Sequence, residues 1–174
     1  EIQEEFLLEA TFDSKNQPKA LAELFELKLQ TKDKKDALSI GFNAIKSLRR
    51  LIRNHRKELD HQLKANNFTE SKRITVGIRS SYEMLSDIYF QCSELMKSKQ
   101  SKIQCIDLSL DFNPLNVSAN FQKGILAKNN SSADYITYFK TCIENDWRHW
   151  HARWEYVKAL EKEMPEEELI SHLN

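Results

Sequence analysis

The chain has 174 residues, enough for one compact domain or a short run of repeats, and its formal net charge is zero. Hydrophobic residues make up 40% of the chain and charged residues 30%, but no apolar run reaches the roughly 18 residues that a membrane-spanning helix needs. The three Gly and three Pro are few for the tight turns of a β-rich domain, so the composition favours an all-α fold.

The N-terminal half predicts two short helices followed by a long helical hairpin. Residues 1–12 and 18–31 are expected to form the short helices, with Pro18 at a first helical position. A long amphipathic helix is expected from about Asp36 to Lys64. Its apolar residues recur mostly at steps of three and four: Leu38, Phe42, Ile45, Leu48, Leu51, Ile52, Leu59 and Leu63. Thr69 is the expected N-cap of the next helix, which runs to about Lys97 and should pack antiparallel to the first.

The C-terminal half predicts further helical hairpins in series. Breaks are expected at Asn113-Pro114, at residues 129–132 and at Met164-Pro165. The first hairpin places large and small residues in turn on its two helices: Tyr82, Leu85, Ser86 and Tyr89, then Ile106, Ser109 and Leu110. The second begins at Asn116 and carries Ala119, Phe121, Gly124 and Ala127, then Tyr135, Phe139 and Cys142. A third begins near Trp147, and a last helix begins near Pro165.

These hairpins resemble tetratricopeptide repeats over roughly residues 80–160. That family has a period of about 34 residues, small residues where its two helices cross, and Pro at the end of the second helix. Pro114 stands at such an end, while Gly124 and Cys142 match the small residues. Asn120 departs from the pattern because a large aromatic is usual there, and Trp147 stands where the next Pro would fall. A second resemblance, to the half-a-TPR repeats of RNA-processing factors, comes from the Trp and Tyr residues after position 146.

The resemblance implies an antiparallel α-solenoid that binds another protein through its surface. We therefore expect an N-terminal helical bundle over residues 1–79 and tetratricopeptide-like repeats over residues 80–174, joined in one continuous structural unit. The expected function is that of a non-catalytic scaffold or adaptor, which binds a partner helix or an acidic or extended peptide. Tyr82, Asn120 and Lys123 are the candidate groove residues. Self-association through an uncapped end of the repeats is a further interpretation.

The charge is distributed unevenly along the chain, with its basic part in the middle. The balance is −4 over residues 1–31, +8 over residues 32–79 and −4 over residues 80–174. Within the long helix, basic side chains follow one another at steps of three and four: Arg49, Arg53, Arg56 and Lys57. The first interpretation is a solvated helix face that pairs with Glu58 and Asp60, or with acidic neighbours. The second is a docking surface for an acidic protein segment. The third is an RNA-binding helix over residues 46–64, although no aromatic residue interleaves with these arginines in the sequence.

A Trp-rich segment marks the end of the repeats. On one helix, Trp147, Trp150 and Trp154 would share a face, which favours a core stripe that closes the solenoid. The alternative is an aromatic anchor for a partner, with Trp150 and Trp154 as its candidate residues.

Metal binding, cofactors and catalysis have no support in the sequence. His149 and His151 are two residues apart, and His55 and His61 are six apart, so neither pair fits the helical metal spacing of four. Phosphate-binding Gly-rich loops and nucleophile elbows are absent from the sequence, so no enzyme is expected. Cys92, Cys105 and Cys142 form an odd set without C-x-x-C spacing, which predicts buried thiols. Together with an acidic N-terminus unlike a signal peptide, they predict a reducing intracellular compartment, cytoplasm or nucleus.

Overall fold

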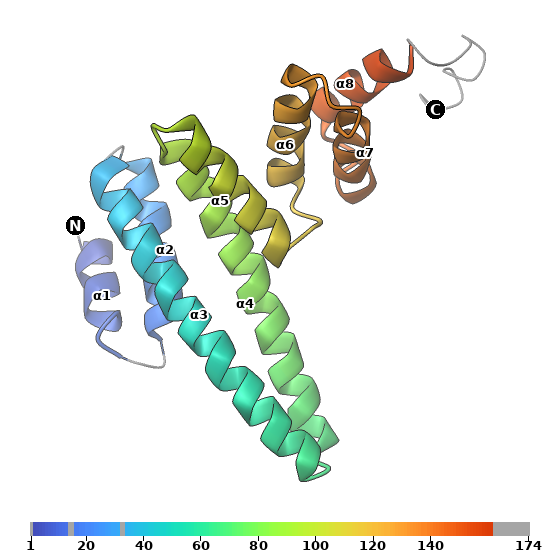
Figure 1. Ribbon diagram of the computed structural model, residues 1–174. Coiled ribbons are helices and arrows are strands. Elements are labelled where there is room, and N and C mark those ends of the chain that lie inside the picture. Colours follow the sequence, from blue (N-terminus) through green and yellow to red (C-terminus); the bar gives the residue numbers. More distant parts are fainter. Residues whose placement is uncertain (1, 14–15, 32–33, 162–174) are drawn as a thin grey trace. The chain divides into compact units, whose positions relative to one another are not determined.

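The computed structural model describes residues 2–13, 16–31 and 34–161, and within these ranges all regular secondary structure is helical (Figure 1). The described helices are α1 (Ile2–Ala10), α2 (Gln17–Gln30), α3 (Lys34–Lys64), α4 (Phe68–Leu95), α5 (Lys99–Phe112), α6 (Val117–Asn129), α7 (Tyr135–Asn145) and α8 (Trp150–Leu160). This confirms the predicted all-α class and its antiparallel hairpins. The helix expected near Pro165 lies outside the described residues.

The chain divides into two compact units, unit 1 (residues 1–112) and unit 2 (residues 113–174). The sequence predicted a boundary between residues 79 and 80, but α4 runs without interruption through both positions. The division follows α5 because α5 packs back against α4 and completes the helical layer of unit 1. The predicted break at Asn113-Pro114 therefore coincides with the division between the units.

Unit 1 is built around the long antiparallel hairpin of α3 and α4. Helix α2 packs against α3, α5 packs against α4, and α1 contacts α2 (Figure 1). The hairpin turns at Asn66, whose φ of 54° lies in the left-handed region that Asn tolerates. The N-cap of α4 is Asn67, whose side chain accepts from the backbone N–H of Glu70 at 3.3 Å. This corrects the prediction for Thr69, which lies inside the first turn of the helix.

Close approach of helices in unit 1 depends on small residues. A Cβ on Gly41 of α3 would lie 2.8 Å from the Cys92 Sγ and 3.0 Å from the Phe25 ring, so Gly at this position lets α2, α3 and α4 meet. Between α4 and α5, the hydroxyls of Ser86 and Ser109 lie 2.9 Å apart and both residues are fully buried. Ser86, the small residue predicted on the first repeat helix, therefore lies where α4 and α5 cross.

Unit 2 also has small residues where its helices cross. Helix α6 packs against α7, and α7 packs against α8. A Cβ on Gly124 would lie 2.7 Å from the ring of Phe139, which is fully buried in α7. Cys142 is also fully buried, and its Sγ donates to the carbonyl oxygen of Val117 at 3.3 Å. Gly124 and Cys142 are therefore the small residues at this crossing, as the resemblance implied.

Candidate partner-binding surfaces

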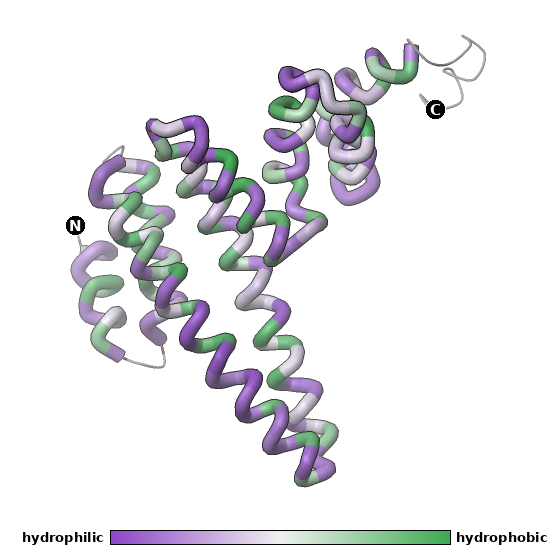
Figure 2. Tube along the Cα trace, viewed as in Figure 1, coloured by the Kyte–Doolittle hydropathy of each residue, from purple (hydrophilic) through white to green (hydrophobic). Residues whose placement is uncertain are grey.

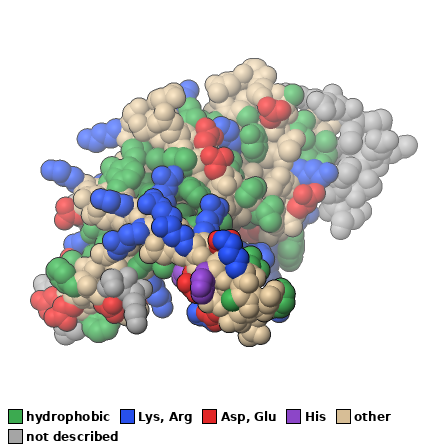
Figure 3. All heavy atoms as spheres, turned by 60° about the horizontal axis from the view of Figure 1, so that its bottom comes forward, with side chains coloured by type: hydrophobic (Ala, Val, Ile, Leu, Met, Phe, Trp, Pro, Cys, Tyr) green, Lys and Arg blue, Asp and Glu red, His purple; other side chains and the backbone are tan. Residues whose placement is uncertain are grey.

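The basic residues of α3 form one exposed face of unit 1. Figure 2 shows that hydrophilic residues dominate the half of α3 next to its loop with α4. Between residues 46 and 64 the helix has seven Lys and Arg against two acidic residues. We use the name α3 basic face for its exposed members Lys46, Arg49, Arg50, Arg53, Arg56 and Lys57. Figure 3 shows Lys and Arg side chains gathered on this part of the molecule.

The two acidic residues of this helix segment do not neutralise that face. Glu58 accepts from Gln62 at 2.6 Å, and Asp60 pairs with Lys64 at 2.7 Å. Within the described part of the chain, Lys46, Arg53 and Lys57 have neither an ion pair nor a hydrogen bond from their charged groups. Lys46, Arg53 and Lys57 therefore do not pair with Glu58 or Asp60, while the exposure of the face agrees with the solvated part of the first interpretation.

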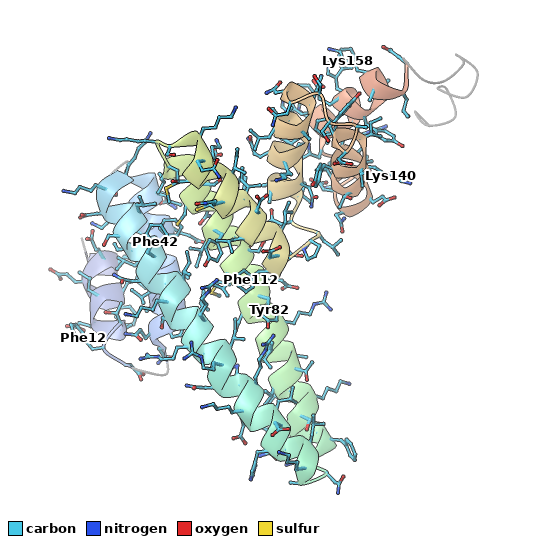
Figure 4. The ribbon with its side chains drawn as sticks, viewed as in Figure 1. Phe12, Phe42, Tyr82, Phe112, Lys140 and Lys158 are labelled. Carbon is cyan, nitrogen blue, oxygen red and sulfur yellow. The ribbon has the colours of Figure 1, made fainter. Side chains whose placement is uncertain are left out.

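Two arginines of the face rest on aromatic rings contributed by α4 and α5. The Arg49 guanidinium carbon lies 5.7 Å from the ring centre of Tyr89 and 5.5 Å from that of Phe112. The Arg56 guanidinium donates to the Tyr82 hydroxyl and lies 5.7 Å from its ring centre. Tyr82 and Phe112 are labelled in Figure 4, and their ring centres are 5.7 Å apart. The sequence pattern had indicated no aromatic neighbours for these arginines, because the rings come from other helices.

These contacts hold the two guanidinium groups in place and occupy the rings. Each cation–π contact at an exposed site contributes about 0.5–1 kcal/mol. Tyr89 and Phe112 stack with an interplanar angle of 4°. Burial raises the pKa of the Tyr89 phenol, and the neighbouring Arg49 offsets part of the rise. Since nucleic-acid bases need a free aromatic face to stack on, this packed cluster is a poor platform for RNA.

The predicted groove residues are divided between the two units. Tyr82 lies in unit 1 under Arg56, whereas Asn120 and Lys123 lie on α6 in unit 2. Asn120 is only 4% exposed, and its side-chain nitrogen donates to the carbonyl oxygens of Pro114 and Asn116. This corrects the prediction for Asn120, which stabilises the start of α6 from inside. Lys123 is half-buried one turn further along the helix.

The three tryptophans lie on the surface of unit 2. Their exposed fractions are 66% for Trp147, 64% for Trp150 and 56% for Trp154. The predicted core stripe is therefore wrong, and Trp147 precedes α8 rather than lying on it. At about 100° per residue, positions 150 and 154 lie opposite Ala152, which is fully buried against α7.

Cationic side chains accompany these exposed rings. The Lys158 Nζ lies 4.7 Å from the ring centre of Trp154, and the Arg148 guanidinium carbon lies 5.4 Å from that of Trp147. Trp and Arg are the residues that most often dominate the energetics of protein interfaces. The alternative interpretation of the Trp-rich segment, as an aromatic anchor for a partner, stays a prediction.

The described residues offer no evident centre for metal chemistry or membrane insertion. Among them, no group of three or more His, Cys, Asp or Glu side chains is placed to hold a metal ion. The described helices also include none with the length and apolar character needed to cross a bilayer.

The comparisons with known proteins yield only distant similarity. No protein-family model matches the chain, and no curated protein matches its sequence. A crystal structure of MamA matches with 16% identity and a TM-score of 0.40, over 86% of this chain and 90% of that chain. A second MamA structure matches with 15% identity and a TM-score of 0.39, over 90% and 87%. A structure of MamA from Desulfovibrio magneticus RS-1 matches with 13% identity and a TM-score of 0.31, over 84% and 85%. At these values the similarity assigns neither a family nor a function.

Proposed function

We propose that the chain is a non-catalytic protein-interaction domain whose α3 basic face binds an acidic segment of a partner protein. The observation that carries the proposal is the set of unpaired cations on that face within the described residues. Arg49 and Arg56 are held on aromatic rings, so ordering them on binding costs less side-chain entropy. Their guanidinium edges present paired donors that suit carboxylates.

The proposed binding set is Arg49, Arg53, Arg56 and Lys57, with Tyr82 supporting Arg56. Either an acidic helix or an extended acidic peptide would fit, since the exposed cations follow the axis of α3 over more than two turns. Trp150 and Trp154 form a second, independent contact surface in unit 2. Lys123 stays a prediction, and Asn120 is left out because it is buried.

We also propose that the hairpins α4–α5 and α6–α7 are tetratricopeptide-like. The support comes from the small residues at their crossings, Ser86 with Ser109 and Gly124 with Phe139. Scaffold proteins commonly use such hairpins to present rigid surfaces. A reducing compartment also remains a proposal, supported by the three buried thiols of Cys92, Cys105 and Cys142.

The test is affinity capture by the whole chain from a lysate, with and without nuclease, followed by identification of the bound proteins. The variant is Arg53→Glu with Lys57→Glu, because neither side chain makes a polar contact within the described residues and the fold should tolerate the change. The matched control is Lys97→Glu with Lys99→Glu, which reverses two exposed charges outside α3. We expect acid-rich partners that survive nuclease, bind the control, and bind the variant at least about tenfold more weakly.

Three outcomes would contradict the proposal. Partners that disappear with nuclease would favour the RNA-associated interpretation. Equal binding by the variant and the control would exclude the α3 basic face as the binding site. Capture of further copies of this chain alone would favour self-association.

A further inference from the structure

Unit 1 contains a basic cleft where α2 and the end of α1 meet α3. Its volume is about 460 Å³. The side chains that matter for its chemistry are Gln17, Asn43, Lys46, Ser47, Arg50 and Arg53. Among the described residues that line the cleft, none is Asp or Glu. The described lining therefore combines three cations with neutral polar groups.

One hydrogen-bond network fixes part of this cleft. The side-chain oxygen of Gln17 accepts from the Ser47 hydroxyl at 3.2 Å and from an Arg50 nitrogen at 2.7 Å. Gln17 comes from α2, whereas Ser47 and Arg50 come from α3, so the network joins the two helices. The oxygen of Gln17 is thus already used as an acceptor, and its NH₂ group remains available as a donor.

The three cations of the cleft are hydrogen-bond donors without acceptor atoms in their charged groups. Lys46, Arg50 and Arg53 follow one another at steps of four and three along α3, so their charged ends share one side of the helix. Lys46 and Arg53 make no polar contact within the described residues. A ligand with several acceptor oxygens and more than one negative charge would match this set better than a single carboxylate.

We propose that this cleft binds a phosphate monoester. Such a group carries a charge of about −1.5 to −2 at neutral pH and three acceptor oxygens. Arg50, held by Gln17, would give a fixed guanidinium donor, and Lys46 would add a point charge from the next turn of α3. The inference goes beyond the proposed binding of an acidic protein segment. The cleft shares Lys46, Arg50 and Arg53 with the α3 basic face, whereas Gln17, Asn43 and Ser47 lie outside that face, so their amides report on the cleft.

The phosphate could come from a phosphorylated side chain of a protein or from a small phosphate compound. The test is a titration of the ¹⁵N-labelled full chain, followed by NMR at constant ionic strength. The probes are phenyl phosphate and a short peptide with one phosphoserine, with acetate and the unphosphorylated peptide as controls. We expect saturable shifts at the amides of Gln17, Asn43 and Ser47. Tighter binding of the phosphopeptide would identify a protein side chain as the source, and equal binding would identify a small phosphate compound.

Three variants make the test specific. Gln17→Ala keeps the net charge but releases Arg50, and Lys46→Gln removes one cation without a described contact; each should weaken binding at least about tenfold. Lys72→Gln removes the same charge from an exposed position on α4, outside the cleft and outside the α3 basic face, and should leave the affinity unchanged. Equal weakening by Lys72→Gln and Lys46→Gln would overturn the proposal, since it would show general charge attraction. Shifts of the same size and position with acetate, or shifts that never saturate, would overturn it as well.

Discussion

Replacing Gly124 with Ala tests the crossing of α6 and α7 in unit 2. The new Cβ would lie 2.7 Å from the Cε1 atom of Phe139 and 2.9 Å from its Cδ1 atom. The ring is fully buried, so either it or the backbone of α6 must shift. Overpacking of this kind costs about 1–3 kcal/mol. The higher helix propensity of Ala offsets at most about 1 kcal/mol of this cost. We therefore expect Gly124→Ala to lower the free energy of unfolding of unit 2, by about 1 kcal/mol as a central value.

Gly77→Ala is the matched control because it makes the same chemical change inside a helix of unit 1. Its nearest neighbour would be the Cε1 atom of His55 at 3.6 Å, an ordinary van der Waals contact. The propensity gain should then appear alone and raise the free energy of unfolding by about 0.5–1 kcal/mol. The two substitutions should differ in sign, and the difference between them isolates the overpacking term.

Amide hydrogen exchange read by mass spectrometry separates the two effects, because peptides from α6 and α7 report on unit 2 and peptides from α3 and α4 report on unit 1. Faster exchange in α6 and α7 of Gly124→Ala and slower exchange in α3 and α4 of Gly77→Ala are expected. Increased stability of unit 2 in Gly124→Ala would refute the reasoning, since it would mean that the crossing has room for a methyl group.

Three further perturbations test other parts of the structure. Ser109→Ala removes the hydroxyl that donates to the carbonyl oxygen of Ser86 at 2.8 Å; urea unfolding should show a loss of about 0.5–1.5 kcal/mol, and no loss would contradict the role of this pair. Burial raises the pKa of the Cys92 thiol from 9.0 to about 12. The unfolded thiol ionises first, so stability is unaffected below pH 9.0 and falls above it by up to about 1.4 kcal/mol per pH unit. The urea midpoint of Cys92→Ala, measured at increasing alkaline pH, should fall less steeply than that of the unchanged chain. An unchanged dependence of the midpoint on pH would refute the assignment. Trp150→Ala and Trp154→Ala should each change the free energy of unfolding by no more than about 0.5 kcal/mol, because both rings are exposed; a loss above about 3 kcal/mol would place the ring in the core.

The helices were predictable because their signals are local. Steps of three and four between apolar residues predicted α3 from about Asp36 to Lys64, and it runs from Lys34 to Lys64. Asn116 was predicted to begin a helix, and its side chain caps α6 by accepting from the backbone N–H of Ala119 at 3.0 Å. Gly124 and Cys142 were also found, because a helix crossing limits the size of the residue at one position whatever the partner helix is.

The surfaces were less predictable because they join residues far apart in the chain. Arg56 and Tyr82 are 26 residues apart, and Gln17 and Arg50 are 33 apart. These contacts depend on how α3 is rotated about its axis relative to α4 and α2. The spacing of residues along one helix does not determine that rotation, so it does not identify the partner of each side chain. The basic spacing on α3 therefore predicted the presence of the α3 basic face, but it gave no information on the aromatic rings or the cleft at its edges.

Apolar side chains gave the most misleading signal, for a reason that bears on function. Phe42, labelled in Figure 4, fits the apolar stripe of α3, yet its exposed fraction is 44%. On α8 the large rings of Trp150 and Trp154 indicated a buried face, but the helix packs on α7 through the small Ala152 instead. A short helix approaches its neighbour most closely on a small-residue face, so large rings on the other side remain exposed. Exposed Trp rings beside cationic side chains are also frequent at the energetic centres of protein interfaces. The same residues that defeat the core prediction are therefore the ones on which the proposed contact surface of unit 2 depends.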